Sequence, residues 1–187
     1  APETLRFGIS ALILGGGYGR GEGGVALDKD GNEGLHNDYD FFVITDNISF
    51  LQKRRLKAWL ADLSRQLTEG IGIDVDFSPP KNRRELSRME YNMMWQELKH
   101  GHKVILGDSR VLDLLPDYDI RLMPAIEGVR LMLNRGAGLI FCQDKLKNNE
   151  GTPESLEFIR RNIYKARNAC GDVCLIAAGD YHWSYVE

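Results

Sequence analysis

The chain has 187 residues, with 24 basic and 27 acidic side chains, a net charge of −3 and 43% hydrophobic residues. This composition is ordinary for a globular protein of one or two small domains, and it excludes a wholly disordered or a fibrous chain. The slightly acidic balance also disfavours a protein that binds nucleic acid through unspecific phosphate contacts, because such proteins are usually basic.

The first half of the chain alternates between apolar runs and turn-forming segments. An apolar run at 10–14 ends in three glycines and predicts a buried strand that enters a tight turn. A turn-rich loop is expected over 19–37, followed by a β-branched and aromatic strand over 39–44. Apolar residues then recur at helical spacing over 50–67, and an alternating run over 71–77 predicts a third strand.

The second half of the chain is expected to be mainly helical. Three further segments have helical apolar spacing, and helices are predicted over 84–99, 125–145 and 153–178. Thr152 is a good N-cap for the last of them, because a proline and an acid follow it.

The order of these elements predicts the fold class. We expect an α/β (α+β) fold with a small mixed β-sheet flanked by helices, followed by a C-terminal helical domain. The change in composition, with most glycines in the first part of the chain, places the first domain at residues 1–107 and the helical domain at residues 108–187.

The glycine cluster GGGYGRGEGG at 15–24 can be compared with three phosphate-binding patterns. A P-loop ends in Gly-Lys-Ser/Thr, which this cluster lacks. Three of its glycines satisfy GxGxxG, but the turn-rich residues 25–34 stand where the dinucleotide fingerprint requires a helix. The third pattern is a glycine pair at a strand end, Gly16-Gly17, whose backbone N–H groups can approach a triphosphate. A plain flexible turn is the alternative for this pair taken alone.

Two pairs of aspartates lie at spacing i, i+2 on predicted strands. Asp38 and Asp40 begin the second strand, so that both carboxylates point to one face. Asp74 and Asp76 lie in the third strand with the same spacing. Close carboxylates repel each other unless a divalent cation lies between them, and carboxylate oxygens are preferred ligands of Mg²⁺. Each pair therefore indicates either a cation site or, as the alternative, a solvated strand face.

Three segments taken together carry a family resemblance: LGGGYGRGE at 14–22, NDYDFFV at 37–43 and IDVDF at 73–77. They resemble the DNA polymerase β-type nucleotidyltransferase superfamily, most closely its minimal and aminoglycoside-type members. The signature of that family is a Gly-Gly or Gly-Ser pair, a DxD and a third acid on a later strand. The resemblance covers about residues 10–80, and the chain departs from the family in a longer loop before the DxD.

The resemblance implies a nucleotide-binding turn. Gly16 and Gly17 would cradle the triphosphate, and Arg20 would neutralise phosphate charge, with a surface arginine as the alternative. Gly17 stands at the usual serine position of the family. Backbone amides can still bind phosphate without that hydroxyl.

The resemblance also implies a catalytic metal site. Asp38, Asp40 and Asp76 would be the catalytic residues and would hold two Mg²⁺ ions, with Asp74 as the alternative third acid. The third acid would help to activate the acceptor hydroxyl. Catalysis would then consist mainly of positioning and charge neutralisation.

The function expected from these features is that of a nucleotidyltransferase. It would transfer a nucleoside monophosphate from an NTP, ATP in the first instance, to a hydroxyl acceptor on a small molecule or a protein. The alternative is a nucleotide-binding regulatory or antitoxin-like module with weak or no transferase activity, and a nucleic-acid polymerase is disfavoured. The partners expected are the nucleotide and an acceptor that the sequence does not identify. No membrane partner is expected, and a homodimer is left open.

A cytoplasmic location is expected. No apolar run approaches the roughly 18 residues of a membrane helix, and no secretory signal is visible. Cys142, Cys170 and Cys174 are odd in number, which fits a reducing compartment better than a disulfide framework. Cys170 and Cys174 are expected to be buried as small apolar residues, and no CxxC or HExxH motif predicts zinc.

Overall fold

The computed structural model describes residues 7–27, 31, 33–35, 38–148, 151–184 and 186, with all of their side chains except those of 26, 27 and 154. The chain forms two compact units. The first unit comprises Ala1–Glu90, Met94–Asp117 and Trp183–Glu187, and the second comprises Tyr91–Met93 and Tyr118–His182. The domain boundary expected between residues 107 and 108 stays a prediction.

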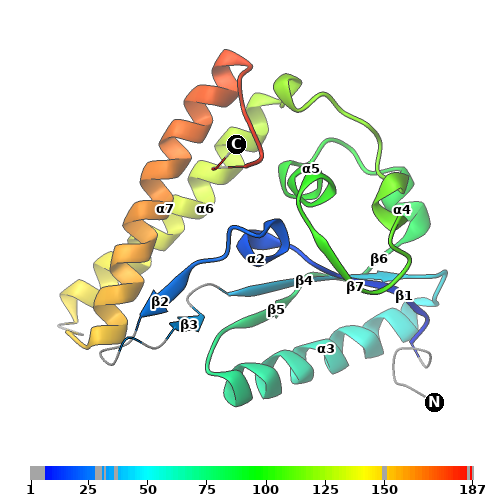
Figure 1. Cartoon of the computed structure of the whole chain (residues 1–187), viewed down its shortest axis with the longest axis horizontal. Helices are drawn as coiled ribbons and strands as arrows, with labels where there is room; N and C mark the ends of the chain where they lie inside the picture. The colour runs from blue at the N-terminus through cyan, green and yellow to red at the C-terminus, as the bar shows by residue number, and fades with distance from the viewer. Residues whose placement is uncertain are drawn as a thin grey trace. The chain divides into compact units, whose positions relative to one another are not determined.

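The first unit is built around a five-stranded mixed β-sheet (Figure 1). Its strands are β1 (Ile9–Leu14), β4 (Tyr39–Thr45), β5 (Val75–Phe77), β6 (Lys81–Asn82) and β7 (Lys103–Gly107). Their order is β5-β4-β1-β7, and β6 pairs with the last residues of β4. β1 is antiparallel to β4 and to β7, whereas β5 and β6 are parallel to β4. The expected small mixed sheet flanked by helices is therefore present.

Helix α3 (Phe50–Ile71) covers one face of the sheet (Figure 1). It joins β4 to β5, and parallel strands require such a crossover connection. Leu56 and Leu60 are the buried residues of α3, and they form one apolar cluster with Val43 of β4. The helical spacing of these leucines in the sequence thus reflects a real buried face.

The opposite face of the sheet is covered by three short elements: α4 (Arg83–Ser87), α5 (Met93–His100) and the 3-10 turn η1 (Val111–Leu114). Ile13 and Ile44 of the sheet are fully buried here. They share an apolar cluster with Leu86, Trp95 and Leu98 of the helices. Because helices cover both faces, β4 is buried without alternation from residue 42 to its end at Thr45.

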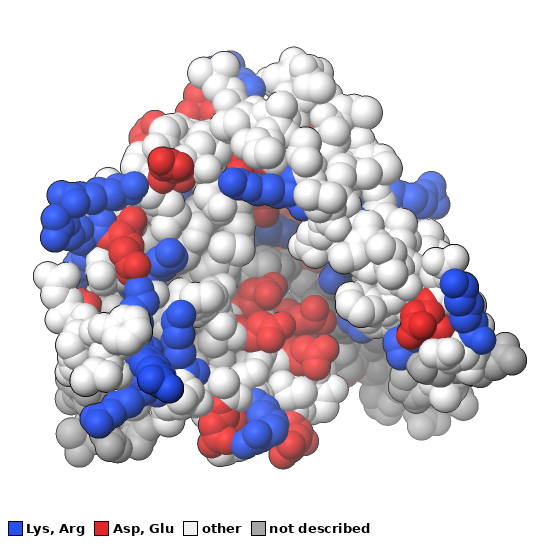
Figure 2. Space-filling view, turned by 180° about the vertical axis from the view of Figure 1, so that it is seen from behind, with Lys and Arg blue, Asp and Glu red and all other residues white. Residues whose placement is uncertain are grey.

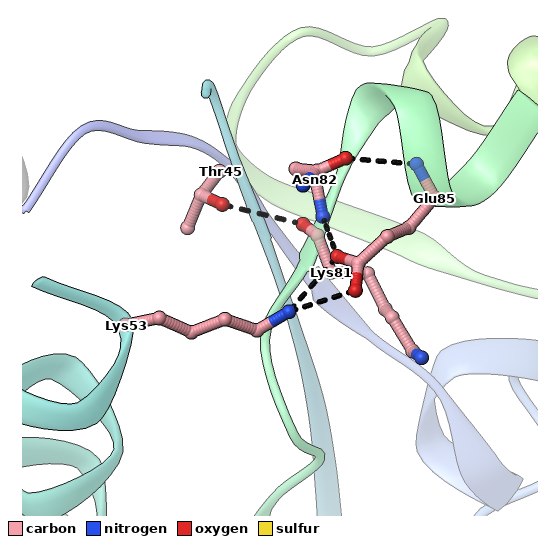
Figure 3. A network of polar contacts seen from close by, with 5 residues as sticks. All are labelled: Thr45, Lys53, Lys81, Asn82 and Glu85. Atoms are coloured by element: carbon pink, nitrogen blue, oxygen red, sulfur yellow. Dashed lines mark hydrogen bonds and ion pairs between the residues drawn. The ribbon is translucent and has the colours of Figure 1, made fainter. Parts of the chain in front are cut away.

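A polar network connects α3 to the start of α4 (Figure 3). Lys53 Nζ donates to both carboxylate oxygens of Glu85, at 2.8 and 3.0 Å. The Asn82 side chain accepts from the N–H of Glu85 at 2.8 Å, and Glu85 accepts from the N–H of Asn82 at 2.7 Å, which forms a capping box. The Thr45 hydroxyl donates to the Lys81 carbonyl at 3.5 Å. Partial burial opposes ionisation of Glu85, but the hydrogen bonds from Lys53 and Asn82 outweigh it and lower the Glu85 pKa.

The structure corrects the predicted elements around the glycine cluster and the third strand. The turn expected after the first strand is the short helix α2 (Gly16–Arg20), and the expected loop contains a hairpin of β2 (Val25–Leu27) and β3 (Glu33–Leu35). α3 extends to Ile71 and ends at Gly72, whose φ of +76° stops the helix. β5 is consequently shorter than the strand predicted over 71–77.

The single helix predicted over 84–99 is two helices, α4 and α5. The break lies between Ser87 and Met93. The N–H of Met93 donates to the Glu127 carboxylate at 2.9 Å. A partner distant in sequence therefore accepts from the first N–H of α5, at a point that the apolar spacing does not mark.

The second unit contains the helices α6 (Ala125–Lys147) and α7 (Pro153–Ala178), which pack along each other as a hairpin (Figure 1). The 3-10 turn η2 (Ile120–Leu122) precedes them. The predicted bounds of α7 are confirmed, and Thr152 accepts from the N–H of Ser155 at 3.2 Å as its N-cap. No helix in the described part of the chain is both long enough and apolar enough to cross a membrane.

The cysteines differ from expectation. Cys142 is buried, but Cys170 and Cys174 are exposed. The buried face of α7 runs through Ala169 and Ile176, and the two cysteines lie outside this stripe. Spacing by one helical turn placed them on one side of the helix, although not on the buried side.

Candidate active site

The acidic residues meet where β4 and β5 lie side by side. Asp40 on β4 is in parallel register with Asp76 on β5, and residues in register on neighbouring strands project to the same face. Asp38, two residues before Asp40, shares that face. The N–H of Tyr39 donates to the carbonyl of Asp74 at 2.8 Å, which places Asp74 just before β5 begins. The structure thus brings all four predicted acids to one end of the β4–β5 pair.

The glycine turn after β1 is fitted against this acidic group. The N–H of Gly15 donates to the carbonyl of Asp40 at 2.8 Å. Gly16 has a φ of +60°, and a Cβ at this position would overlap Oδ2 of Asp40. A Cβ at Gly17 would lie 3.4 Å from the Cα of Gly23. Both conformation and space therefore require glycine at position 16, and the predicted glycine pair directly adjoins the predicted DxD.

Negative charge is concentrated at this site. Figure 2 shows acidic side chains gathered on one face of the molecule. The pKa of Asp76 is raised, first because the surrounding protein partly withdraws its carboxyl from water, and then because the charges of Asp38 and Asp74 oppose its ionisation. A carboxylate with a raised pKa accepts a proton more readily than an ordinary aspartate does.

The donor set suits the expected Mg²⁺, because the carboxylate oxygens of Asp38, Asp40 and Asp76 are hard ligands. A divalent cation would also relieve the repulsion that raises the pKa of Asp76. Within the described residues, however, no three His, Cys, Asp or Glu side chains are already grouped to hold a metal ion. Metal binding would therefore require these partly exposed carboxylates to reorient.

Arg20, the predicted phosphate contact, is engaged in ion pairs. Its Nε donates to Oε2 of Glu22 at 3.0 Å, and its Nη1 lies 4.0 Å from Oε2 of Glu97. Its side chain is only 14% exposed, and its alkyl part fills the space beside Gly101, where a Cβ would overlap it. To reach a phosphate, the guanidinium would have to leave Glu22.

Aromatic rings border the glycine turn. Tyr18 of α2 donates from its hydroxyl to the carbonyl of Gly24 at 2.9 Å, and its ring lies 5.0 Å from that of Tyr39. The row continues through Phe41 and Phe77, with centroid distances of 6.1 and 5.4 Å. Sequence reasoning overlooked this row, although aromatic residues at alternate positions of one strand were a usable signal.

Sequence reasoning also missed the contacts that Glu22 makes. The hydroxyl of Ser184 donates to Oε1 of Glu22 at 2.6 Å, although 162 residues separate the two. No local pattern predicts such a contact. The ion pair with Arg20 did have a local signal, because an acid at position 22 lies two residues after that arginine.

Comparisons of the chain with models of protein families, with curated proteins and with solved structures give no significant match.

Proposed function

We propose that this protein is a nucleotidyltransferase that moves a nucleoside monophosphate from an NTP, with ATP as the first candidate, to a hydroxyl of a small molecule or a protein. One observation carries the proposal: Gly16 lies against Asp40, and Asp40 is in register with Asp76. A turn whose amides can approach phosphates thus adjoins carboxylates that can hold Mg²⁺.

In the proposed reaction, the oxygen of the acceptor hydroxyl attacks the α-phosphorus, the bond to pyrophosphate breaks, and the hydroxyl proton passes to a carboxylate. Asp76 is the candidate for this proton, because the family resemblance gives the third acid the role of activating the acceptor hydroxyl. The backbone N–H groups of Gly16 and Gly17 would bind the phosphates. Asp38, Asp40 and Asp76 would hold the Mg²⁺ ions, which supply neutralisation of the phosphate charge.

A regulatory module that binds a nucleotide without transferring it is the second candidate. Two observations favour it: Arg20 is already paired with Glu22, and no three acidic, histidine or cysteine side chains of the described residues are preformed as a metal site. Such a module would bind an NTP and leave it intact.

Transfer of label from α-radiolabelled NTPs, with Mg²⁺ and a library of hydroxyl acceptors, separates the two candidates. We expect Asp38→Asn and Asp76→Asn to reduce transfer by roughly a hundredfold or more, the usual effect of removing a group that stabilises charge in the transition state. Asp62→Asn is the matched control, because Asp62 lies on α3 and pairs locally with Arg65. Asp74→Asn tests the alternative third acid, since only the true third acid should be essential.

The outcomes are distinct. Transfer by the wild type that is lost in Asp38→Asn and kept in Asp62→Asn supports the enzyme. Binding of Mg²⁺-ATP without transfer to any acceptor or to the protein itself supports the regulatory module. A wild-type protein that binds no NTP contradicts both candidates.

A further inference from the structure

Helix α2, which contains the glycine pair, has too little intrinsic stability to hold its position without contacts to the rest of the protein. It consists of five residues, GGYGR, without a side-chain cap at its N-terminus and without a buried residue. Helices of this length are unstable alone, and glycine makes them less stable still. Besides the backbone hydrogen bond from Gly15 to Asp40, the placement of Gly16 and Gly17 therefore depends on side-chain contacts made by α2 and the residues that follow it.

One such contact runs from Arg20 through Glu22 to the far end of the described chain. Oε2 of Glu22 accepts from Arg20 at 3.0 Å, and Oε1 accepts from the Ser184 hydroxyl at 2.6 Å. The side chains of Arg20 and Glu22 are 14% and 11% exposed. Charged groups that are this little exposed to solvent need hydrogen-bond partners within the protein. The hydrogen bond from Ser184 therefore stabilises the ion pair.

Trp183 also lies close to this arginine. Its ring stacks on His100 with a centroid distance of 6.1 Å and an interplanar angle of 18°. A Cβ at the buried Gly101 would lie 2.9 Å from Trp183 Cζ3 and would overlap Arg20. Arg20 and Trp183 thus share the space that Gly101 leaves open, within the first unit.

We propose that Trp183 and Ser184 form a clasp, which consists of these two residues, and that they are positioning residues for the glycine turn. The clasp holds the Arg20–Glu22 ion pair, and through it α2, in the arrangement that sets Gly16 against Asp40. This role requires no contact with Asp38, Asp40, Asp74 or Asp76. For its consequence on nucleotide binding, the inference rests on the proposed function.

Hydrogen–deuterium exchange of the protein without nucleotide tests the clasp directly. In Ser184→Ala, we expect the backbone amides of residues 16–24 to exchange roughly tenfold faster, as for the loss of one hydrogen bond to a charged group. Ser184→Thr keeps the hydroxyl and should restore the wild-type rates. Ser87→Ala is the matched control, because its exposed hydroxyl bonds to the Arg84 carbonyl of its own helix.

The measurement has three outcomes. Faster exchange confined to residues 16–24 supports the clasp. Unchanged exchange in this segment overturns it, and so does an equal rise over α3 and β7, which would indicate general loosening. None of these outcomes requires that the protein transfer or bind a nucleotide.

Titration with Mg²⁺-ATP then tests the functional consequence. We expect the dissociation constant for Mg²⁺-ATP to be severalfold higher in Ser184→Ala and in Trp183→Ala than in the wild type. Ser184→Thr should restore the wild-type value, and Trp183→Phe should restore it in part. If transfer is detected, KM for ATP should rise more than kcat falls. Equal ATP binding in all variants, despite faster local exchange, overturns the positioning role. A wild type that binds no ATP overturns the proposed function and leaves the exchange result to decide on the clasp.

Discussion

Gly16 combines two constraints that are usually separate. Its φ of +60° is a conformation that other residues adopt only with strain, and the position of a side chain is already filled by Asp40. Gly21 has a comparable φ of +79°, but a Cβ at that position would have nothing within 4 Å. Substitutions at Gly16 and Gly21 therefore allow the effect of backbone strain to be separated from the effect of overlap with Asp40.

We predict that Gly16→Ala destabilises the fold by about 2–3 kcal/mol and abolishes NTP binding, because strain and overlap with Asp40 act together. Gly21→Ala should cost only about 1 kcal/mol, because strain acts alone there. Urea unfolding and ATP titration of both variants check this. Equal effects of the two substitutions would show that contact with Asp40 is unimportant.

The folded protein disfavours the ionised form of Asp76, first by partial desolvation and then through the charges of Asp38 and Asp74. Because its pKa is raised in the folded state, the fold binds the proton more tightly than the unfolded chain does, and stability falls as the pH rises through this pKa. We predict that Asp76→Asn raises the free energy of unfolding at pH 7 without Mg²⁺ by about 0.5 kcal/mol, a small value because the side chain is exposed.

The stabilisation in Asp76→Asn should disappear below about pH 3.5, where the wild-type carboxyl is protonated. Added Mg²⁺ should stabilise the wild type more than the variant, since ligand binding to the native state adds stability. Chemical unfolding at several pH values gives both results. A variant that is less stable than the wild type at pH 7 would argue against repulsion at this site.

At the residue scale, the sequence predicted which side chains share a face of a strand, but it did not predict which charged side chains form ion pairs. Spacing i, i+2 predicted that Asp38 and Asp40 share a face, and that follows from strand geometry alone. The pairing of Arg20 with Glu22 was not predicted, because an arginine in a glycine-rich segment can point to solvent, to a ligand or to an acid. Only the surrounding side chains decide between these, and they come from distant segments. The catalytic roles of the acids stay predictions.

Between elements, the ion pair of Lys53 and Glu85 fastens α3 to the start of α4. Since the pKa of Glu85 is lowered on folding, this contribution is complete above the ordinary glutamate pKa and is lost as the pH falls through the folded value. Glu85→Gln retains a capping side chain and removes the charge, so it isolates the ion pair.

We predict that Glu85→Gln lowers the free energy of unfolding by about 0.5–1 kcal/mol at pH 7, as for a partly exposed pair. The difference from the wild type should shrink to nothing as the pH falls below the lowered pKa that Glu85 has in the folded protein. Asp62→Asn, which removes an exposed pair within one helix, is the control and should change stability less. A deficit in Glu85→Gln that persists at low pH would assign it to capping rather than to charge.

At the element scale, local sequence signals predicted a helix boundary correctly where all the residues that determine it are neighbours in the sequence. The cap at Thr152 and the following proline predicted the start of α7, and both act within one turn of helix. The apolar spacing of α6 predicted a helix but not what buries it, and Leu133 and Ile140 are 70% and 67% exposed. The break between α4 and α5 was missed because the apolar spacing runs across it, and the acceptor of the Met93 N–H, Glu127, lies 34 residues further along the chain.

Across the whole molecule, buried Glu127 is the clearest case of a side chain that organises distant backbone. It is 4% exposed, it pairs with Arg130, and its carboxylate accepts from the N–H of Met93 at 2.9 Å. We predict that Glu127→Ala costs about 2–3 kcal/mol, because it leaves a buried N–H and an arginine without their acceptor. Glu127→Gln keeps an oxygen for Met93 and should cost less.

Urea unfolding and amide exchange at Met93 check this prediction. Faster exchange at Met93 in Glu127→Ala than in Glu127→Gln is the expected order. Identical behaviour of the two variants would mean that the hydrogen bond contributes little and that only the charge matters.

The composition of the chain indicated two parts but not how they are interleaved. The first unit takes its residues from three separate stretches, and the chain leaves it and returns to it more than once. Composition and periodicity describe neighbours along the chain, whereas this division depends on which distant segments pack together. Ser184 and Glu22 belong to one unit for that reason alone.

The contact between Ser184 and Glu22 can form only late in the biosynthesis of the chain. A ribosome extends the chain from the N-terminus, so the glycine turn and all four acids emerge well before the serine that bonds to Glu22. Ser184 lies 162 positions after Glu22, and the long helices α3, α6 and α7 between them have to be translated first. A nascent or prematurely terminated chain would therefore display the acids and the glycines with one end of this tie still missing.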